Sequence, residues 1–241
     1  LPLQVAHQLA PSFREHASFI ALTLVQEPGL VLGRIAQALQ LPEAANQSVL
    51  TQLIAALRTS QRLLVLDNFE HVLAAAASIS ALLEAAPNLK VLVTSRAALH
   101  ILGEHLLSVP PLALPDRSAL PGVEQLGQVP AVALFVQRVQ AVLPEFALTA
   151  TNAADVAAIC RQLDGLPLAL ELAATRCTTF SLQALLTRLQ HPLAILTVGA
   201  RNMPTHQQTL RSTLAWSYDL LPAGAQKLLA RLGVFVGSFT L

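Results

Sequence analysis

The chain has 241 residues, of which 54% are hydrophobic, 12% are charged and 4% are aromatic. A chain of this size buries roughly 70 to 75% of its unfolded surface, so we expect a sizeable core built mainly from Ala, Leu and Val. The 15 Lys and Arg residues nearly balance the 14 Asp and Glu residues, and the formal net charge of +1 excludes a basic field able to hold a nucleic-acid backbone by itself.

The sequence also disfavours a membrane span and a cysteine-based site. The longest apolar stretch, residues 72–83, is shorter than the roughly 20 residues that a membrane span needs. The two cysteines, Cys160 and Cys177, lack the paired short spacings of a zinc site or a redox motif. We therefore expect a cytoplasmic protein without membrane contact, whose thiols are reduced and buried.

The first part of the chain alternates strand and helix patterns, which predicts a parallel sheet with crossover helices. Continuous aliphatic runs suit strands that are covered on both faces. The expected elements are strands at 18–24, 62–67 and 90–94, a last extended piece at 105–109, and helices at 30–41, 47–59 and 70–86. The Pro-rich residues 110–115 then mark the first domain boundary.

Beyond this boundary the pattern becomes almost entirely helical. Thr149 or Asn152 could cap the second of these helices, and Ser181 the fourth. The expected helices are 129–143, 152–163, 166–177, 182–189, one that ends at 221, and 223–232. We therefore expect three domains, at 1–115, 116–200 and 201–241.

The predicted strand at 62–67 ends in an acid, Asp67. Open α/β sheets bind ligands in the crevice outside the carboxyl ends of their strands. A carboxylate at that place can hold Mg²⁺ against nucleotide phosphates. Taken alone, the pattern is better explained by a strand that ends in a turn-forming Asp.

The residue after this acid is an amide, Asn68, which cannot accept a proton from an attacking water. Glu70 is the nearest carboxylate and could polarise such a water. It could also occupy the first turn of the next helix, where the macrodipole favours an acid. The two roles are compatible.

The next strand ends in Thr94, Ser95 and Arg96, and we expect it to be a neighbour of the Asp67 strand. The guanidinium of Arg96 suits phosphate oxygens and could report whether a γ-phosphate is present. The alternative is a solvated charge, which becomes less favoured once the Asp67 strand lies beside it.

Residues 163–169 join two predicted helices. Gly165 suits a left-handed helix C-terminus, and Pro167 suits the first turn of the following helix. The end of one helix and the start of the next, here called helix punctuation, are enough to explain this pair.

Taken together, these segments resemble the STAND class of signal-transduction ATPases, in the NB-ARC-like branch that bacterial LuxR-type and SARP-type transcriptional regulators carry. The order and spacing of the blocks are more specific than any one of them, and the resemblance covers essentially the whole chain. The matching blocks are LLVLDNFEH (63–71), VLVTSR (91–96), AVALFVQR (131–138), ICRQLDGLPLALELAA (159–174) and TLRSTLAWSYDLL (209–221).

The resemblance implies an α/β fold with a P-loop-type parallel sheet, followed by an all-α helical bundle and the start of a winged-helix domain. It implies a switch that binds ATP or ADP with Mg²⁺, hydrolyses ATP slowly and opens on activation. By the same resemblance Asp67 is the metal ligand and Arg96 the sensor arginine. Gly165, Leu166 and Pro167 belong to the motif that contacts the adenine, and Glu70 remains the candidate catalytic carboxylate.

One departure concerns the phosphate loop, GxxxxGK[ST], which has no counterpart in the 241 residues. The opening residues 1–9 resemble the helix that follows that loop, so we expect the sequence to begin a few residues after it. We also expect the remainder of the winged helix, and any DNA-binding domain, beyond Leu241. Any ATPase activity would then be weak and would belong to the longer protein.

Two other functions stay open at this stage. A catalytic ATPase that performs mechanical work would need a strong base beside Asp67, where the chain has Asn68. A helical interaction scaffold without nucleotide is disfavoured by the parallel-strand pattern. The expected partners are a nucleotide, other copies of the chain on activation, and DNA only through a flanking domain.

Overall fold

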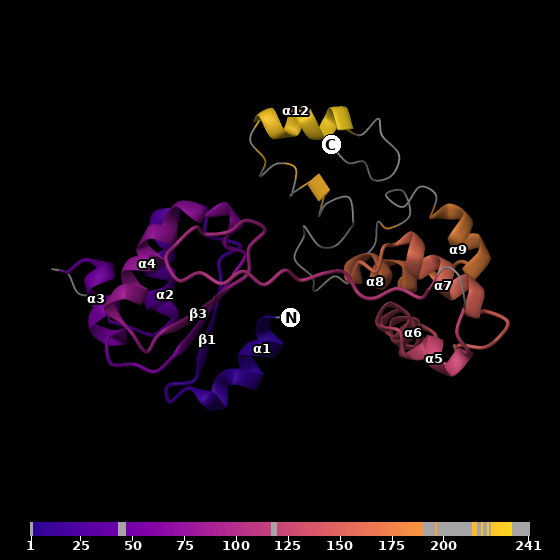
Figure 1. The fold of residues 1–241 in the computed structure, drawn as a ribbon, viewed down its shortest axis with the longest axis horizontal. Helices are drawn as coiled ribbons and strands as arrows, with labels where there is room; N and C mark the ends of the chain where they lie inside the picture. The colour runs from indigo at the N-terminus through magenta and orange to yellow at the C-terminus, as the bar shows by residue number, and fades with distance from the viewer. Residues whose placement is uncertain are drawn as a thin grey trace. The chain divides into compact units, whose positions relative to one another are not determined.

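The computed structural model describes residues 2–42, 47–116, 120–189, 196, 214–215, 218, 221 and 223–232. The chain divides into two compact units, Leu1–Ser108 and Val109–Leu241, and each is described by itself (Figure 1). The predicted boundaries after residues 115 and 200 stay predictions.

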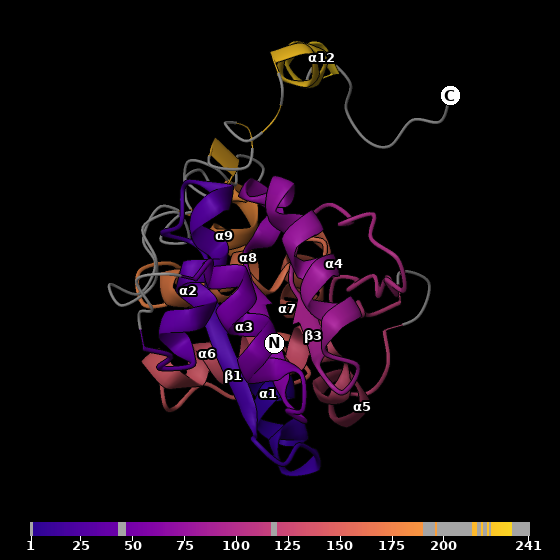
Figure 2. The ribbon, with the colours of Figure 1, turned by 90° about the vertical axis from the view of Figure 1, so that its left-hand side faces the viewer.

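The first unit contains a three-stranded parallel sheet in the order β1-β2-β3 (Figure 2). Its strands are β1 (Ala17–Ala21), β2 (Leu63–Asp67) and β3 (Lys90–Val93). Ala21 lies opposite Asp67, and Val93 lies opposite Leu66. The expected parallel α/β arrangement is confirmed, and its assignment to the P-loop type stays a prediction.

Strand β2 is buried on both faces, which explains its continuous run of aliphatic residues. Successive side chains of a strand point to opposite faces. Leu64 and Leu66 join the larger core under α2 (Val31–Ala38), α3 (Val49–Leu57) and α4 (Ala76–Ala85). Leu63 and Val65 pack with Ala6 of α1 (Pro2–Leu9) on the other face.

The chain between β2 and α4 differs from the single helix predicted at 70–86. Two 3₁₀ turns, η3 (Phe69–His71) and η4 (Leu73–Ala75), come first, and the α-helix begins only at Ala76. Asn68 has a left-handed backbone with φ of 65°, and Val72 has φ of −122° with ψ of 28°, so neither can continue a helix. Long-range hydrogen bonds to Thr94, the residue that directly follows β3, hold this turn and are described below.

The extended piece expected at 105–109 does not join the sheet, because these residues pair with no strand in the described part of the chain. Leu107 in this segment is 88% exposed, and Leu102, which precedes the segment, is 91% exposed. Pro110 and Pro111 follow at once and have no N–H to donate to a sheet.

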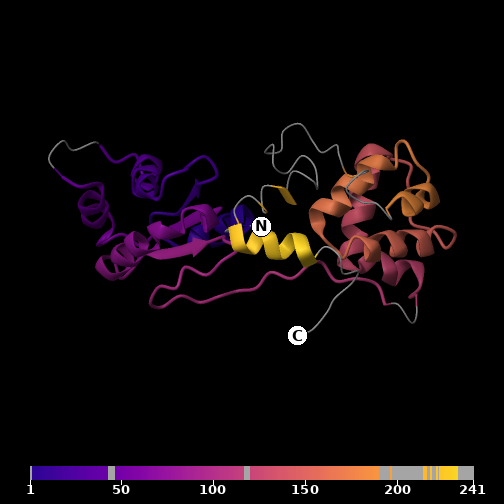
Figure 3. The ribbon, with the colours of Figure 1, turned by 90° about the horizontal axis from the view of Figure 1, so that it is seen from above.

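The second unit is helical among its described residues, as predicted, and its helices can be followed in Figure 3. The sequence reasoning missed one short helix, α5. The helices are α5 (Val123–Gln128), α6 (Pro130–Val142), α7 (Ala153–Gln162), α8 (Pro167–Arg176), α9 (Leu182–Arg188) and α12 (Ala223–Leu232). Helices α5 to α9 share one apolar core around Phe135 and Leu170.

Helix ends in this unit are stabilised by local hydrogen bonds. The predicted cap by Ser181 is confirmed, since its Oγ accepts the Ala184 N–H at 3.3 Å. Asn152 does not cap α7 with its side chain. Its Oδ1 instead accepts the Thr149 N–H at 2.8 Å, which fixes the turn before the helix.

The expected winged-helix region falls mostly outside the described residues. The helix predicted to end at 221 lies there too, apart from a few positions, whereas the helix predicted at 223–232 is confirmed as α12. Within the described part of the chain, every helix is too short or too polar to cross a membrane.

Both thiols should react slowly in the folded protein. Desolvation by burial raises the pKa of Cys160 from 9.0 to about 12 and that of Cys177 to about 11. Because the thiolate is the nucleophile, iodoacetamide at pH 8 should label native protein on the order of a hundredfold or more slowly than urea-unfolded protein. Mass spectrometry measures both rates, and equal rates would contradict the burial of these thiols.

Candidate functional site at the carboxyl edge of the sheet

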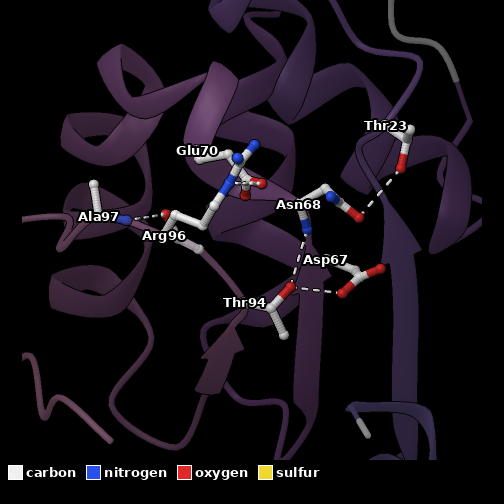
Figure 4. Close-up of polar contacts among 8 residues, drawn as sticks. Thr23, Asp67, Asn68, Glu70, Thr94, Arg96 and Ala97 are labelled. Atoms are coloured by element: carbon white, nitrogen blue, oxygen red, sulfur yellow. Dashed lines mark hydrogen bonds and ion pairs between the residues drawn. The ribbon is translucent and has the colours of Figure 1, made fainter. Parts of the chain in front are cut away.

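Asp67 ends β2 and lies beside the end of β3, as the parallel-strand reasoning predicted (Figure 4). The Thr94 N–H donates to the Leu66 carbonyl at 3.0 Å, so the pairing of β3 with β2 continues one residue past the strand. Thr94, Ser95 and Arg96 therefore leave β3 at the same edge of the sheet at which Asp67 leaves β2.

A single hydroxyl group organises this edge. Thr94 Oγ1 donates to Asp67 Oδ1 at 2.6 Å and accepts the Asn68 N–H at 3.0 Å. The Thr94 carbonyl accepts the Phe69 N–H at 2.9 Å. These bonds hold Asn68 in its left-handed conformation, and they orient Asp67 Oδ1 toward Thr94.

The segment after β1 is held against the same turn from the other side. The Leu22 N–H donates to the Asp67 carbonyl at 3.0 Å, and the Thr23 hydroxyl donates to Asn68 Oδ1 at 3.3 Å. His71 Nε2 lies 3.0 Å from the Leu22 carbonyl, which requires Nε2 to carry a hydrogen. His71 Nδ1 is buried and has no hydrogen-bond partner among the described residues.

Glu70 and Arg96 form an ion pair across this edge. Arg96 Nε donates to Glu70 Oε1 at 3.0 Å, and the Glu70 side chain is only 11% exposed against 41% for Arg96. Sequence reasoning proposed a role for each residue separately and did not predict the pair. Glu70 lies in the first 3₁₀ turn, so the expected interaction with the dipole of a long helix does not apply.

The oxygen donors at this edge suit Mg²⁺ that arrives with a phosphate. Asp67 is one carboxylate, and the described residues contain no group of three or more His, Cys, Asp or Glu that could hold a metal ion. Mg²⁺ is typically bound by one or two carboxylates together with waters and substrate phosphates. Asp67 fits that arrangement and does not form a metal site by itself.

The remaining predicted site residues, Gly165, Leu166 and Pro167, belong to the second unit. Gly165 is left-handed with φ of 66°, and Pro167 is the first residue of α8, which confirms the predicted helix punctuation. The Gly165 N–H donates to the Cys160 carbonyl at 3.2 Å and so closes α7. Contact of this turn with an adenine stays a prediction.

Sequence reasoning placed Thr94 at this edge without a role, and it missed the contacts of Thr94, Thr23 and His71 there. A signal for Thr94 was present, since a hydroxyl that directly follows a parallel strand lies level with the acid that ends the neighbouring strand. Thr23 and His71 carried no comparable signal, because their contacts depend on the path of the loops.

No protein-family model matches the chain. It is 37% identical, over its whole length, to a protein of Mycobacterium tuberculosis (strain ATCC 25618 / H37Rv) named "Putative HTH-type transcriptional regulator", of which it covers 26%. A Mycobacterium bovis protein of that name shows the same identity and coverage. An "Uncharacterized protein" of M. tuberculosis is also 37% identical, and the chain covers 58% of it.

The chain thus spans about a quarter of the named regulators and a little over half of the uncharacterised relative. The identity of 37% extends across all residues of the chain in each of these comparisons.

Replacing the Thr94 hydroxyl should loosen the turn after β2. In Thr94→Val, the Asn68 N–H loses its acceptor and Asp67 loses a donor, at a cost of about 1–3 kcal/mol. The Asn68 amide should then exchange its hydrogen roughly 5- to 150-fold faster, measured by hydrogen exchange. Thr94→Ser keeps the hydroxyl and is the control, and equal exchange in the two variants would contradict the role given to Thr94.

Proposed function

We propose that this chain is the nucleotide-responsive core of a transcriptional regulator, which binds ATP or ADP with Mg²⁺ and acts as a slow switch. The observation that carries the proposal is the convergence of Asp67, Glu70 and Arg96 at the carboxyl ends of two adjacent parallel strands. This is where α/β sheets bind ligands. The similarity to named regulators supports the regulatory part of the proposal.

Asp67 is proposed as the ligand that receives Mg²⁺ together with the nucleotide phosphates. Thr94 donates to Oδ1, which fixes the carboxylate plane. Oδ2 accepts no hydrogen bond from the described residues and is the oxygen available to the ion or to its waters. Bound Mg²⁺ would supply the charge that neutralises the phosphates.

Arg96 is proposed as the group that distinguishes ATP from ADP. Its Nε is paired with Glu70, a single carboxylate. A γ-phosphate carries more charge and offers bidentate acceptors, so it can compete for the guanidinium, whereas ADP has no such group. When ATP is bound, Arg96 would leave Glu70. This change of partner would be the first structural difference between the ATP-bound and ADP-bound states.

The same pair accounts for slow hydrolysis. Asn68 cannot act as a base, and its side-chain oxygen accepts the Thr23 hydroxyl. We propose that Glu70 polarises a water once Arg96 has left it. Hydrolysis would therefore depend on the movement that senses ATP, which suits a switch better than an enzyme of continuous turnover.

In this proposal the second unit contributes Gly165, Leu166 and Pro167 as the turn that contacts the adenine. The regulators named in the comparisons are of HTH type, and we propose that DNA is bound by such a flanking domain. With a formal net charge of +1, this chain has no basic field able to bind a nucleic-acid backbone by itself. Opening would expose surfaces for self-association in the cytoplasm.

Nucleotide affinities of the natural gene product that contains these residues test the proposal. Asp67→Ala should weaken binding of Mg²⁺-ADP and leave Mg²⁺-free ADP little changed. Arg96→Ala should narrow the preference for ATP over ADP. Isothermal titration calorimetry measures all four affinities.

The matched control is Arg138→Ala, which breaks a surface pair of similar geometry, Arg138 to Glu171 at 2.9 Å, in the second unit. It should leave all affinities unchanged. If Asp67→Ala and Arg96→Ala behave like this control, the assignment fails. Rapid, unstimulated multiple turnovers would instead favour the mechanical ATPase, and absence of any nucleotide binding would favour the scaffold.

The 241 residues by themselves should bind nucleotide weakly or not at all. They contain no GxxxxGK[ST] segment, the loop whose backbone amides and Lys hold the phosphates. Calorimetry with ADP and Mg²⁺ should therefore give no saturable heat at micromolar concentrations. Micromolar binding would show that the residues described above suffice without that loop.

A further inference from the structure

Residues 110–116, here called the strap, have no regular secondary structure and yet are firmly bonded to the second unit. The Leu112 N–H donates to the Gly165 carbonyl at 3.0 Å. The Ala113 carbonyl accepts the Ala131 N–H from the first turn of α6 at 3.2 Å. The Asp116 carbonyl accepts Arg161 Nη1 from the end of α7 at 3.3 Å.

The strap also contributes apolar contacts to this unit. Leu112 packs against the core formed by helices α5 to α9, and Pro115 is buried. Three hydrogen bonds, to α6, to α7 and to the turn between α7 and α8, together with these contacts, hold the strap along the helical unit.

Gly165 is required for the strap as well as for the helix turn. A Cβ at this position would lie 3.2 Å from the Leu112 carbonyl carbon and in collision with the Leu112 carbonyl oxygen. A left-handed turn alone accepts Asn or Asp at moderate cost, as Asp164 shows with φ of 51°. The absence of a side chain at Gly165 is therefore explained by the close approach of Leu112.

The residues that precede the strap are held differently. Leu102, Leu107 and Val109 are 91%, 88% and 64% exposed. Between residues 105 and 111 no backbone N–H or carbonyl is hydrogen-bonded to another backbone group of the described chain. The change from unbonded to bonded backbone occurs at Leu112.

We propose that the strap is a fixed part of the helical unit, docked on Gly165, and that the chain swivels in residues 105–109, which precede it. The turn that contains Gly165 and Pro167 then moves together with the strap. Gly165 thereby determines how many residues of the connection between the two units are free to rotate. This inference does not depend on nucleotide binding.

Hydrogen exchange of the 241-residue chain tests the docking. In Gly165→Ala, the Leu112 and Ala131 amides should exchange roughly 5- to 150-fold faster, because the added methyl group displaces the strap. Thermolysin should also cleave within the strap at an increased rate. The core of α6 to α8 should keep its protection.

Gly127→Ala is the matched control, because a Cβ there meets only Leu148 Cδ2 at an ordinary 3.7 Å. It should change neither exchange nor cleavage in the strap. Native strap amides that exchange as fast as those of residues 105–109 would overturn the proposal.

A second variant keeps the test independent of the fold of the Gly165 turn. Leu112→Pro removes the N–H that donates to Gly165 and should raise Ala131 exchange and strap cleavage as Gly165→Ala does. Leu114→Pro is its control, since the Leu114 N–H has no hydrogen-bond partner in the described chain. If Leu112→Pro matches this control, the strap is not docked through Gly165 and the proposal fails.

Discussion

The carboxyl edge of the sheet depends on one hydroxyl group that bonds in two directions. Thr94 Oγ1 donates to the carboxylate of Asp67 and accepts the backbone N–H of Asn68. It thereby joins the ends of β2 and β3, forces the left-handed turn at Asn68 and delays the start of α4 to Ala76. Glu70, which forms the ion pair with Arg96, lies two residues after Asn68 in the 3₁₀ turn that follows.

The fold was predictable from sequence wherever the local residue pattern of an element was enough to determine its secondary structure. The aliphatic run of β2 indicated a strand covered on both faces, and the structure buries alternate residues in two separate cores. The prediction of one helix at 70–86 was wrong because bonds to Thr94, remote in sequence, override local helix propensity. The extended piece at 105–109 does not join the sheet, because β propensity alone provides no partner strand.

In the candidate site, too, the positions set by the strand pattern were predictable, and the contacts made by the loops were not. Because parallel strands present their carboxyl ends at one edge, the strand pattern alone is enough to bring Asp67 and Arg96 to that edge. The engagement of Arg96 with Glu70 depends on loop paths that no periodicity encodes. Gly165 was correctly assigned to a helix end, but its second task, the close approach of Leu112, is a contact between segments 53 residues apart.

The central claim is that this edge binds Mg²⁺-nucleotide and that Arg96 changes partner when ATP is present. A crystal structure of the natural gene product with Mg²⁺ and a non-hydrolysable ATP analogue tests it most directly. The account predicts Mg²⁺ beside the Asp67 carboxylate, directly or through a water, and the Arg96 guanidinium on the γ-phosphate instead of on Glu70. A nucleotide bound elsewhere, or an intact Glu70 to Arg96 pair beside a bound γ-phosphate, would contradict it.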